Sequence, residues 1–393
     1  MRRIGLVGSV LALCAGAMSA QQQPASRSAA DEQQPIFRLS VDLVQLDAVV
    51  TDKKGRHVTT LGPGDFEVLQ DGRPQQVVAA TYVEMEDDWI DSSGLPPLPA
   101  EATRPADAQR VMAIVVDDSR MSFESIHHAR RGLGEFVDEQ FRRGDRAMLV
   151  TTSGYGLPSR LTSSPGTLKA AVNRLRYSLW GMRAASALEP LDGSFDPFDA
   201  SDEFLERTFS VNAIVRIEQA IAAVKELPGR KSVILVSEGF SVAGFGMDNA
   251  MIRDALQRLV DHSNRAGVVI YAVDPRGLVF TGLTAADSTR GLSAQRLASL
   301  SGMRSAALRD SQDGLKFVAG ETGGFAVVNS NDLARGFERI MTDQRGYYLI
   351  GYQPEAGTIN PKSYSKFRRL KIKVKEKGMK VRTRAGFYAR PTG

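Results

Sequence analysis

Acidic and hydroxyl side chains gather directly after a continuous apolar segment. Residues 111–116 are all apolar, and Asp117, Asp118, Ser119 and Ser122 follow within six positions. An unbroken apolar run of this length is typical of a strand buried in a parallel sheet. Open α/β sheets bind ligands at the carboxyl ends of their strands, and carboxylate and hydroxyl oxygens are ligands of hard cations such as Mg²⁺. The sequence therefore predicts a candidate divalent-cation site after residue 116.

The elements that must position these residues alternate between strand and helix patterns over residues 110–345. Short apolar runs predict strands at 111–116, 147–150, 232–236, 268–273 and 324–328. Helical periodicity predicts helices at 123–141, 168–175, 214–227, 252–266 and 333–343, and the end of a helix at 315–321. This alternation predicts an α/β domain with a doubly wound, mostly parallel sheet. Two Gly/Ser/Ala-rich stretches of poor periodicity, 179–206 and 278–310, are expected to be insertions that shape the rim of the site.

Both ends of the chain have the alternating pattern of β-strands instead. Residues 37–85 and 346–393 contain short alternating runs, and each segment alone lacks partners for its strand edges. We therefore expect the two segments to form one small β-sandwich, with the α/β domain inserted between its halves. An acidic and then proline-rich segment, 86–109, is the expected linker between the first half and the α/β domain.

The first 20 residues have the three-part pattern of a signal peptide. Arg2 and Arg3 precede a mostly apolar stretch, and Met18-Ser19-Ala20 offers small residues for cleavage. The apolar stretch falls short of the roughly 20 residues that span a bilayer, and no other stretch is long or apolar enough. We expect an exported protein, periplasmic, cell-surface or secreted, with 21–36 as a polar linker. Removal of the signal peptide would also remove Cys14, the one cysteine of the chain, and with it any thiolate chemistry.

Charge and motifs argue against several other classes of function. A formal net charge of +5 is too small to indicate a nucleic-acid partner. The chain has no Gly-x-Ser-x-Gly elbow, Walker A loop or Gly-x-Gly-x-x-Gly after the first predicted strand, so a hydrolase or nucleotide-binding enzyme is not expected. A phosphate-accepting receiver domain is also excluded, because residues 153–164 contain no carboxylate where its acceptor aspartate would stand.

Several ordered pieces of sequence resemble the von Willebrand factor A (VWFA) superfamily, in particular bacterial VWFA-related proteins of the acidobacterial type. The pieces are Val-Val-Asp-Asp-Ser-Arg-Met-Ser at 115–122, Leu-Pro-Gly-Arg-Lys-Ser-Val-Ile-Leu-Val-Ser-Glu-Gly-Phe at 227–240, Ile-Tyr-Ala-Val-Asp-Pro-Arg-Gly-Leu at 270–278 and Arg-Gly-Tyr-Tyr-Leu-Ile-Gly-Tyr at 345–352. The resemblance covers nearly the whole chain after the signal peptide. It implies a VWFA-like fold for the α/β domain and a binding function in place of catalysis.

The resemblance also implies a metal site, which this chain matches only in part. The family pattern is an Asp-x-Ser-x-Ser loop, a Thr from a second loop and an Asp from a third. Asp117 and Ser119 match the first loop, whereas its last serine is replaced by Met121, with Ser122 one place late. Glu238 stands at the position of the third-loop Asp. The second-loop Thr would be Thr208, although a gapless reading places Ala213 there.

A purely structural role for the same residues is the alternative. Asp118 or Ser119 would then cap the following helix, and Glu238 would pair with a nearby arginine. The ion in a functional site would be Mg²⁺ or Mn²⁺.

A second charged feature is a row of alternating lysines on one face of a predicted strand, at positions 371, 373, 375 and 377. They could grip an anionic polymer, but a solvated face or an edge protected against aggregation explains them as well.

The sequence thus predicts an exported, non-enzymatic VWFA-like module that binds a protein or another cell-envelope component. The alternative is a structural envelope scaffold whose VWFA-like domain no longer binds metal. Metal binding at Asp117, Ser119, Ser122 and Glu238 separates the two.

Overall fold

The computed structural model describes residues 43–85, 110–154, 160–178, 200–242, 247–284, 287, 293–355 and 367–388. The predicted signal peptide 1–20, the linkers 21–36 and 86–109, and residues 179–199 of the first predicted insertion lie outside these ranges. No helix in the described part of the chain combines the length and the apolar character that a membrane span requires.

The α/β segment contains a parallel sheet of five strands in the order β5-β4-β6-β7-β8. Its strands are β4 (Arg110–Val116), β5 (Arg146–Thr151), β6 (Arg230–Val236), β7 (Val268–Val273) and β8 (Ala326–Val327). All four pairings between these strands are parallel. Every residue of β4 is buried, because both faces of this central strand are covered.

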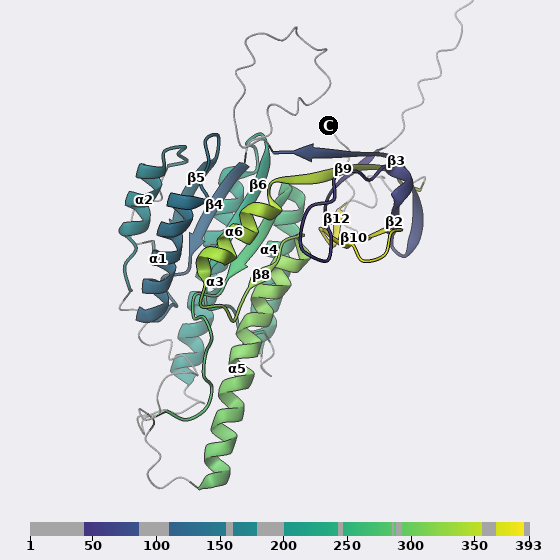
Figure 1. The fold of residues 1–393 in the computed structure, drawn as a ribbon. Helices are drawn as coiled ribbons and strands as arrows, with labels where there is room; N and C mark the ends of the chain where they lie inside the picture. Colours follow the sequence, from purple (N-terminus) through teal and green to yellow (C-terminus); the bar gives the residue numbers. More distant parts are fainter. Residues whose placement is uncertain are drawn as a thin grey trace, which may run out of the picture. The chain divides into compact units, whose positions relative to one another are not determined.

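Helices cover both faces of the parallel sheet, as expected for a doubly wound arrangement (Figure 1). The helices are α1 (Phe123–Glu139), α2 (Pro165–Asn173), α3 (Ala200–Val224), α4 (Met247–Ala266), α5 (Ala294–Glu321) and α6 (Leu333–Asp343). Alternate residues of β4 point to opposite faces: Ile114 packs with α1, α2 and α6, and Ala113 packs with α3, α4 and α5.

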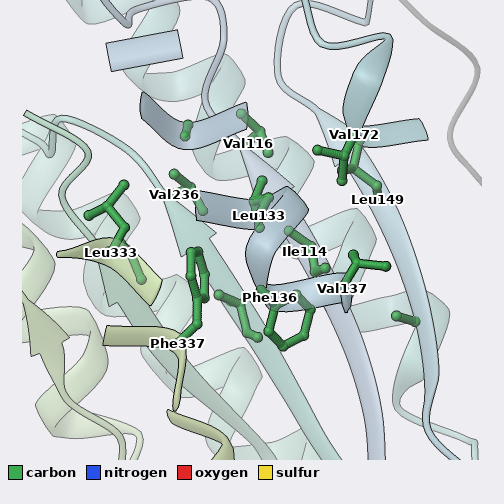
Figure 2. Packing of buried hydrophobic residues seen from close by; sticks show 14 of the residues in the cluster. Ile114, Val116, Leu133, Phe136, Val137, Leu149, Val172, Val236, Leu333 and Phe337 are labelled. Carbon is green, nitrogen blue, oxygen red and sulfur yellow. The ribbon is translucent and has the colours of Figure 1, made fainter. Parts of the chain in front are cut away.

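The apolar cluster on the α1 face is closely interlocked. Figure 2 shows Phe136 of α1 and Phe337 of α6 meeting over the sheet, with ring centroids 5.4 Å apart. Each such fully buried side chain contributes about 1.5–3 kcal/mol relative to an exposed one. Met121 and Ile126 belong to the same cluster, which therefore also holds the start of α1, and the loop before it, against the sheet.

The remaining strands form one antiparallel sheet in the order β11-β1-β9-β3-β2-β10-β12. They are β1 (Val44–Thr51), β2 (Phe66–Gln70), β3 (Arg73–Glu84), β9 (Gly346–Gln353), β10 (Phe367–Val374), β11 (Lys380–Thr383) and β12 (Gly386–Tyr388). Strands from before and after the α/β segment are therefore neighbours, and β9 lies between β1 and β3.

This sheet differs from the expected sandwich of two facing sheets, because it is continuous and curls around its own core. The first residues of the 12-residue strand β3 pair with β2, and the rest pair with β9. A bulge between Val77 and Ala79 lies near the start of the part that pairs with β9, and bulges bend strands and increase their twist. The curl lets Leu46, Val68, Ile350 and Ile372 from four strands share one buried cluster.

Helix α5 departs from the sequence prediction. We expected residues 278–310 to lack periodic structure and residues 315–321 to end a helix; the helix does end at Glu321, but it begins as early as Ala294. Figure 1 shows its first half extending past the parallel sheet, and most side chains of residues 293–303 are exposed there. Because that half packs against little, it has no apolar stripe from which a helix could be predicted.

Candidate functional site

Four polar residues line the carboxyl edge of the parallel sheet, one directly after each of four strands. They are Thr152 after β5, Asp117 after β4, Ser237 after β6 and Asp274 after β7. Backbone hydrogen bonds continue the strand pairing to all four, from Asp117 N to Val236 O (2.9 Å), Thr152 N to Val116 O (3.1 Å), Ser237 N to Val273 O (3.1 Å) and Asp274 N to Val327 O (2.9 Å). The parallel register thus places these side chains in one row.

Three hydroxyl groups surround the carboxylate of Asp117. Thr152 Oγ1 donates to Asp117 Oδ1 at 2.8 Å, Ser119 Oγ donates to the same oxygen at 3.2 Å, and Ser237 Oγ donates to Oδ2 at 2.8 Å. The hydroxyls of Ser119 and Thr152 are themselves 2.8 Å apart. Asp117 and Ser237 have no exposed surface, so hydrogen bonds from protein groups take the place of water around this carboxylate.

Arg120 supplies a positive charge beside the same carboxylate. Its Nη1 lies 3.6 Å from Asp117 Oδ2, and the side chain is only 9% exposed. The same nitrogen donates to the carbonyl of Gly239 at 2.6 Å, and the guanidinium lies 5.3 Å from the ring centre of Phe240. Arg120 is therefore held in place between the loop after β4 and the loop after β6.

Asp118 faces the loop after β5. Its Oδ1 accepts from the backbone N–H of Ser153 at 2.9 Å, and its Oδ2 accepts from the Ser153 hydroxyl at 2.5 Å. Burial raises the pKa of Asp118, the Ser153 hydrogen bonds oppose that shift, and the neighbouring Asp117 charge adds to it. Asp118 thus joins two loops and does not cap α1.

Ser122 and Glu238 contact each other, and neither donates to or accepts from Asp117. The backbone N–H of Ser122 donates to Glu238 Oε1 at 2.8 Å. Ser122 is the N-cap of α1, where its hydroxyl accepts from the backbone N–H of Ser125 at 3.2 Å. The cap of α1 is therefore Ser122, and the alternative expectation of a cap at Asp118 or Ser119 was wrong.

The threonine beside Asp117 is Thr152, which the sequence interpretation missed. Thr208 is exposed on α3, and Ala213 is buried in the core between α3 and the sheet. Thr152 and Ser237 could have been found, because each follows a predicted strand and the carboxyl ends of parallel strands share one edge.

A second arginine–carboxylate pair extends the row. Asp274 accepts from Arg276 Nε at 2.9 Å and from Arg276 Nη2 at 2.8 Å, and Gln312 Nε2 donates to it at 3.1 Å. Arg276 Nη2 also donates to the backbone carbonyl of Glu238 at 2.6 Å. The arginine predicted near Glu238 is thus present, but it bonds the main chain of that residue.

As arranged, the Asp117 group does not fit a divalent cation. Its hard oxygen donors suit Mg²⁺ or Mn²⁺, but both carboxylate oxygens already accept hydroxyl protons and a guanidinium stands 3.6 Å away. Arg120 would repel a divalent cation. The carboxylate of Glu238 accepts a hydrogen bond from the backbone N–H of Ser122.

Comparison with known proteins does not narrow the function. No family model matches the chain, and no curated protein matches it.

Proposed function

We propose that this chain is an exported, VWFA-like binding module in which Arg120 takes the place of the metal ion beside Asp117. The five-stranded parallel sheet with helices on both faces supports a VWFA-like domain. The sharing of one antiparallel sheet by strands 44–84 and 346–388 supports an insertion of that domain between them. The ordered sequence pieces at 115–122, 227–240 and 270–278 support the same assignment.

The position of Arg120 carries the proposal. A guanidinium 3.6 Å from a fully buried carboxylate supplies the charge compensation that a cation would otherwise supply. Unlike a bound ion, this charge is part of the chain and does not depend on metal supply. Binding through this edge of the sheet is therefore independent of divalent cations.

Exposed apolar side chains on the same edge give a partner a surface to contact. Phe123 directly follows the α1 N-cap and is 69% exposed, while Leu278 and Phe280, in the loop after β7, are 67% and 72% exposed. Aromatic side chains are among the residues that contribute most to protein–protein affinity. A protein partner with an apolar patch is the occupant that this chemistry favours.

A two-part binding experiment on the full chain tests the proposal. Calorimetric titration with millimolar Mn²⁺ is expected to give no binding, either to wild type or to the control Asp138→Ala on α1. Mn²⁺ binding by wild type that disappears in Asp117→Ala would restore the metal-dependent mechanism.

The second part is affinity capture from the cell envelope, with and without chelator. Capture of a partner is expected to survive chelation and to be lost in a Phe123→Ser/Phe280→Ser double variant. The control Met251→Ser alters another exposed apolar residue, on α4, and should retain the partner. If wild type, the double variant and Met251→Ser all fail to capture a specific partner, the structural-scaffold alternative is favoured.

A further inference from the structure

Arg230 is a buried arginine that has no carboxylate partner among the described residues. It begins β6 at the amino edge of the parallel sheet, opposite to the Asp117 edge, and is 7% exposed. Its Nε and Nη1 atoms are buried and find no hydrogen-bond acceptor among the described residues. An unsatisfied buried donor costs about 1–3 kcal/mol, and more when it is charged.

The neighbouring arginine shows how this fold normally compensates such a charge. Arg110 pairs with Arg230 in the β4–β6 register, and its Nε donates to the buried Asp145 at 2.6 Å. The buried Arg304 likewise has Asp287 at 2.6 Å. Of the three arginines that are buried in the described ranges, Arg230 alone has no carboxylate within 4.0 Å.

Other unsatisfied donors lie around Arg230, where the two sheets meet. The guanidinium lies 4.9 Å from the ring centre of Tyr347 on β9. Gln344, whose Oε1 accepts from Ser232 at 3.0 Å, has a buried Nε2 without an acceptor in the described structure. Ser232 is two residues beyond Arg230 and therefore on the same face of β6.

His57 approaches the same place from the antiparallel sheet. Its Nδ1 is 3.1 Å from the hydroxyl of Tyr82, and its buried Nε2 has no hydrogen-bond partner among the described residues. The charges of Arg230, Arg382 and Arg345 all act on its ring, together with the backbone carbonyl of Thr342.

Among the described residues, the acidic groups near this cluster are few and do not neutralise Arg230. Asp343 is bonded to Arg382 and to the hydroxyl of Tyr271. Asp47 and Glu84 act electrostatically on Tyr347 and Tyr82, respectively, but neither reaches Arg230 within 4.0 Å. The cluster therefore has an excess of donors and of positive charge.

We propose that Arg230, His57 and Gln344 form a binding site for a small oxyanion of the sulfate or phosphate class, at the junction of the two sheets. Oxyanions accept several hydrogen bonds at once, and the planar guanidinium fork suits them particularly well. The ion would satisfy Nε and Nη1 of Arg230 and balance its charge. This site is independent of the proposed partner-binding edge.

Sulfate is the best probe, because its charge does not change between pH 5 and pH 8. Thermal unfolding of the full chain is measured in sulfate and in chloride of equal ionic strength. At a sulfate concentration well above its Kd, the Tm of wild type is expected to rise by about 2–4 °C relative to chloride. Arg230→Gln should weaken sulfate binding by about tenfold or more, since it removes a charged hydrogen-bonding partner.

Matched variants separate a specific site from general salt effects. Sulfate also stabilises proteins by exclusion from their surface, but this effect acts equally on wild type and Arg230→Gln. Lys371→Gln removes an exposed positive charge from β10 and should leave the response unchanged. Should Arg230→Gln fold poorly, His57→Gln, which leaves the arginine in place, should still lower the sulfate affinity.

Equal sulfate responses of wild type, Arg230→Gln and His57→Gln would overturn the proposal, and water would then satisfy the donors. A wild type that responds to sulfate no more than to chloride would overturn it as well.

Discussion

The surroundings of His57 favour its neutral form. Burial is the largest cause that lowers its pKa below the ordinary 6.5, and the charges of Arg230, Arg382 and Arg345 lower it further, against the opposing Thr342 carbonyl. At pH values near 6.5 the unfolded chain therefore binds more protons at this ring than the folded protein does.

This difference predicts how stability depends on pH. Stability is full above the unfolded pKa and falls as pH drops below about 6.5, because the unfolded state then binds more protons. In chloride buffer, His57→Gln should remove up to about one proton from the slope of unfolding free energy against pH. Urea unfolding at pH 5.5, 6.5 and 8.0 measures it, with the exposed His127→Gln as control. If the unfolding free energy of wild type and of His57→Gln depended on pH in the same way, His57 would not be the cause of the pH dependence.

The candidate site could be predicted from sequence only as far as its first loop. Asp117 and Ser119 were identified because they directly follow an unmistakable buried strand. Glu238 was expected beside Asp117, but its carboxylate accepts a hydrogen bond from the backbone N–H of Ser122. The role of Arg120 could not be predicted, because it depends on the approach of the β6 loop at Gly239.

At the scale of elements, one glycine sets the approach of α1 to α6. A Cβ added at Gly132 would lie 2.8 Å from Leu333 Cβ and 3.4 Å from the ring of Phe337. Neither helix can move away without opening the cluster of Figure 2. Close packing here thus requires the absence of a side chain.

Gly132→Ala is therefore expected to destabilise the protein by about 1–3 kcal/mol, through overpacking. Gly134, two residues along the same helix, has nothing within 4 Å of an added Cβ, so Gly134→Ala should stabilise by about 0.5–1 kcal/mol. Urea unfolding of both variants measures the difference. Effects of the same sign would show that helix propensity, and not the Leu333 contact, dominates.

The elements themselves could be predicted wherever burial imposes a pattern. Helix α6 (Leu333–Asp343) and strand β7 (Val268–Val273) have the expected bounds, because α6 has one strongly apolar face and β7 is covered on both sides. Helix α3 begins at Ala200, well before the expected 214, and α5 likewise begins early. Helical segments that contact few neighbours carry no period in their sequence.

At the scale of the whole molecule, a buried acid connects the parallel sheet to the antiparallel one. Asp343 at the end of α6 accepts a 2.7 Å hydrogen bond from Tyr271 of β7 and is paired with Arg382 of β11. The backbone N–H of Ala385 donates to the carbonyl of Glu321 at 3.0 Å nearby. These contacts should make the two sheets unfold together.

Asp343→Ala leaves Arg382 and Tyr271 without their acceptor and is expected to cost about 3 kcal/mol or more. Amide hydrogen exchange should then show β9 and β10 opening before β4 and β6, whereas in wild type all four open with similar free energies. The control Asp313→Ala removes an exposed acid of α5. If all four strands still opened with similar free energies in Asp343→Ala, the coupling of the two sheets would not depend on this residue.

The place of β9 between β1 and β3 has a consequence for biosynthesis. Glu84 of β3 pairs with Gly346 of β9, so the ribosome makes roughly 260 residues between these two strands. A ribosome delivers β1 and β3 long before the strand that joins them, and their unpaired edges must meanwhile be kept from other chains. We infer that completion of β9 is a late step in maturation, and that a nascent chain stalled before residue 346 is a substrate for chaperones.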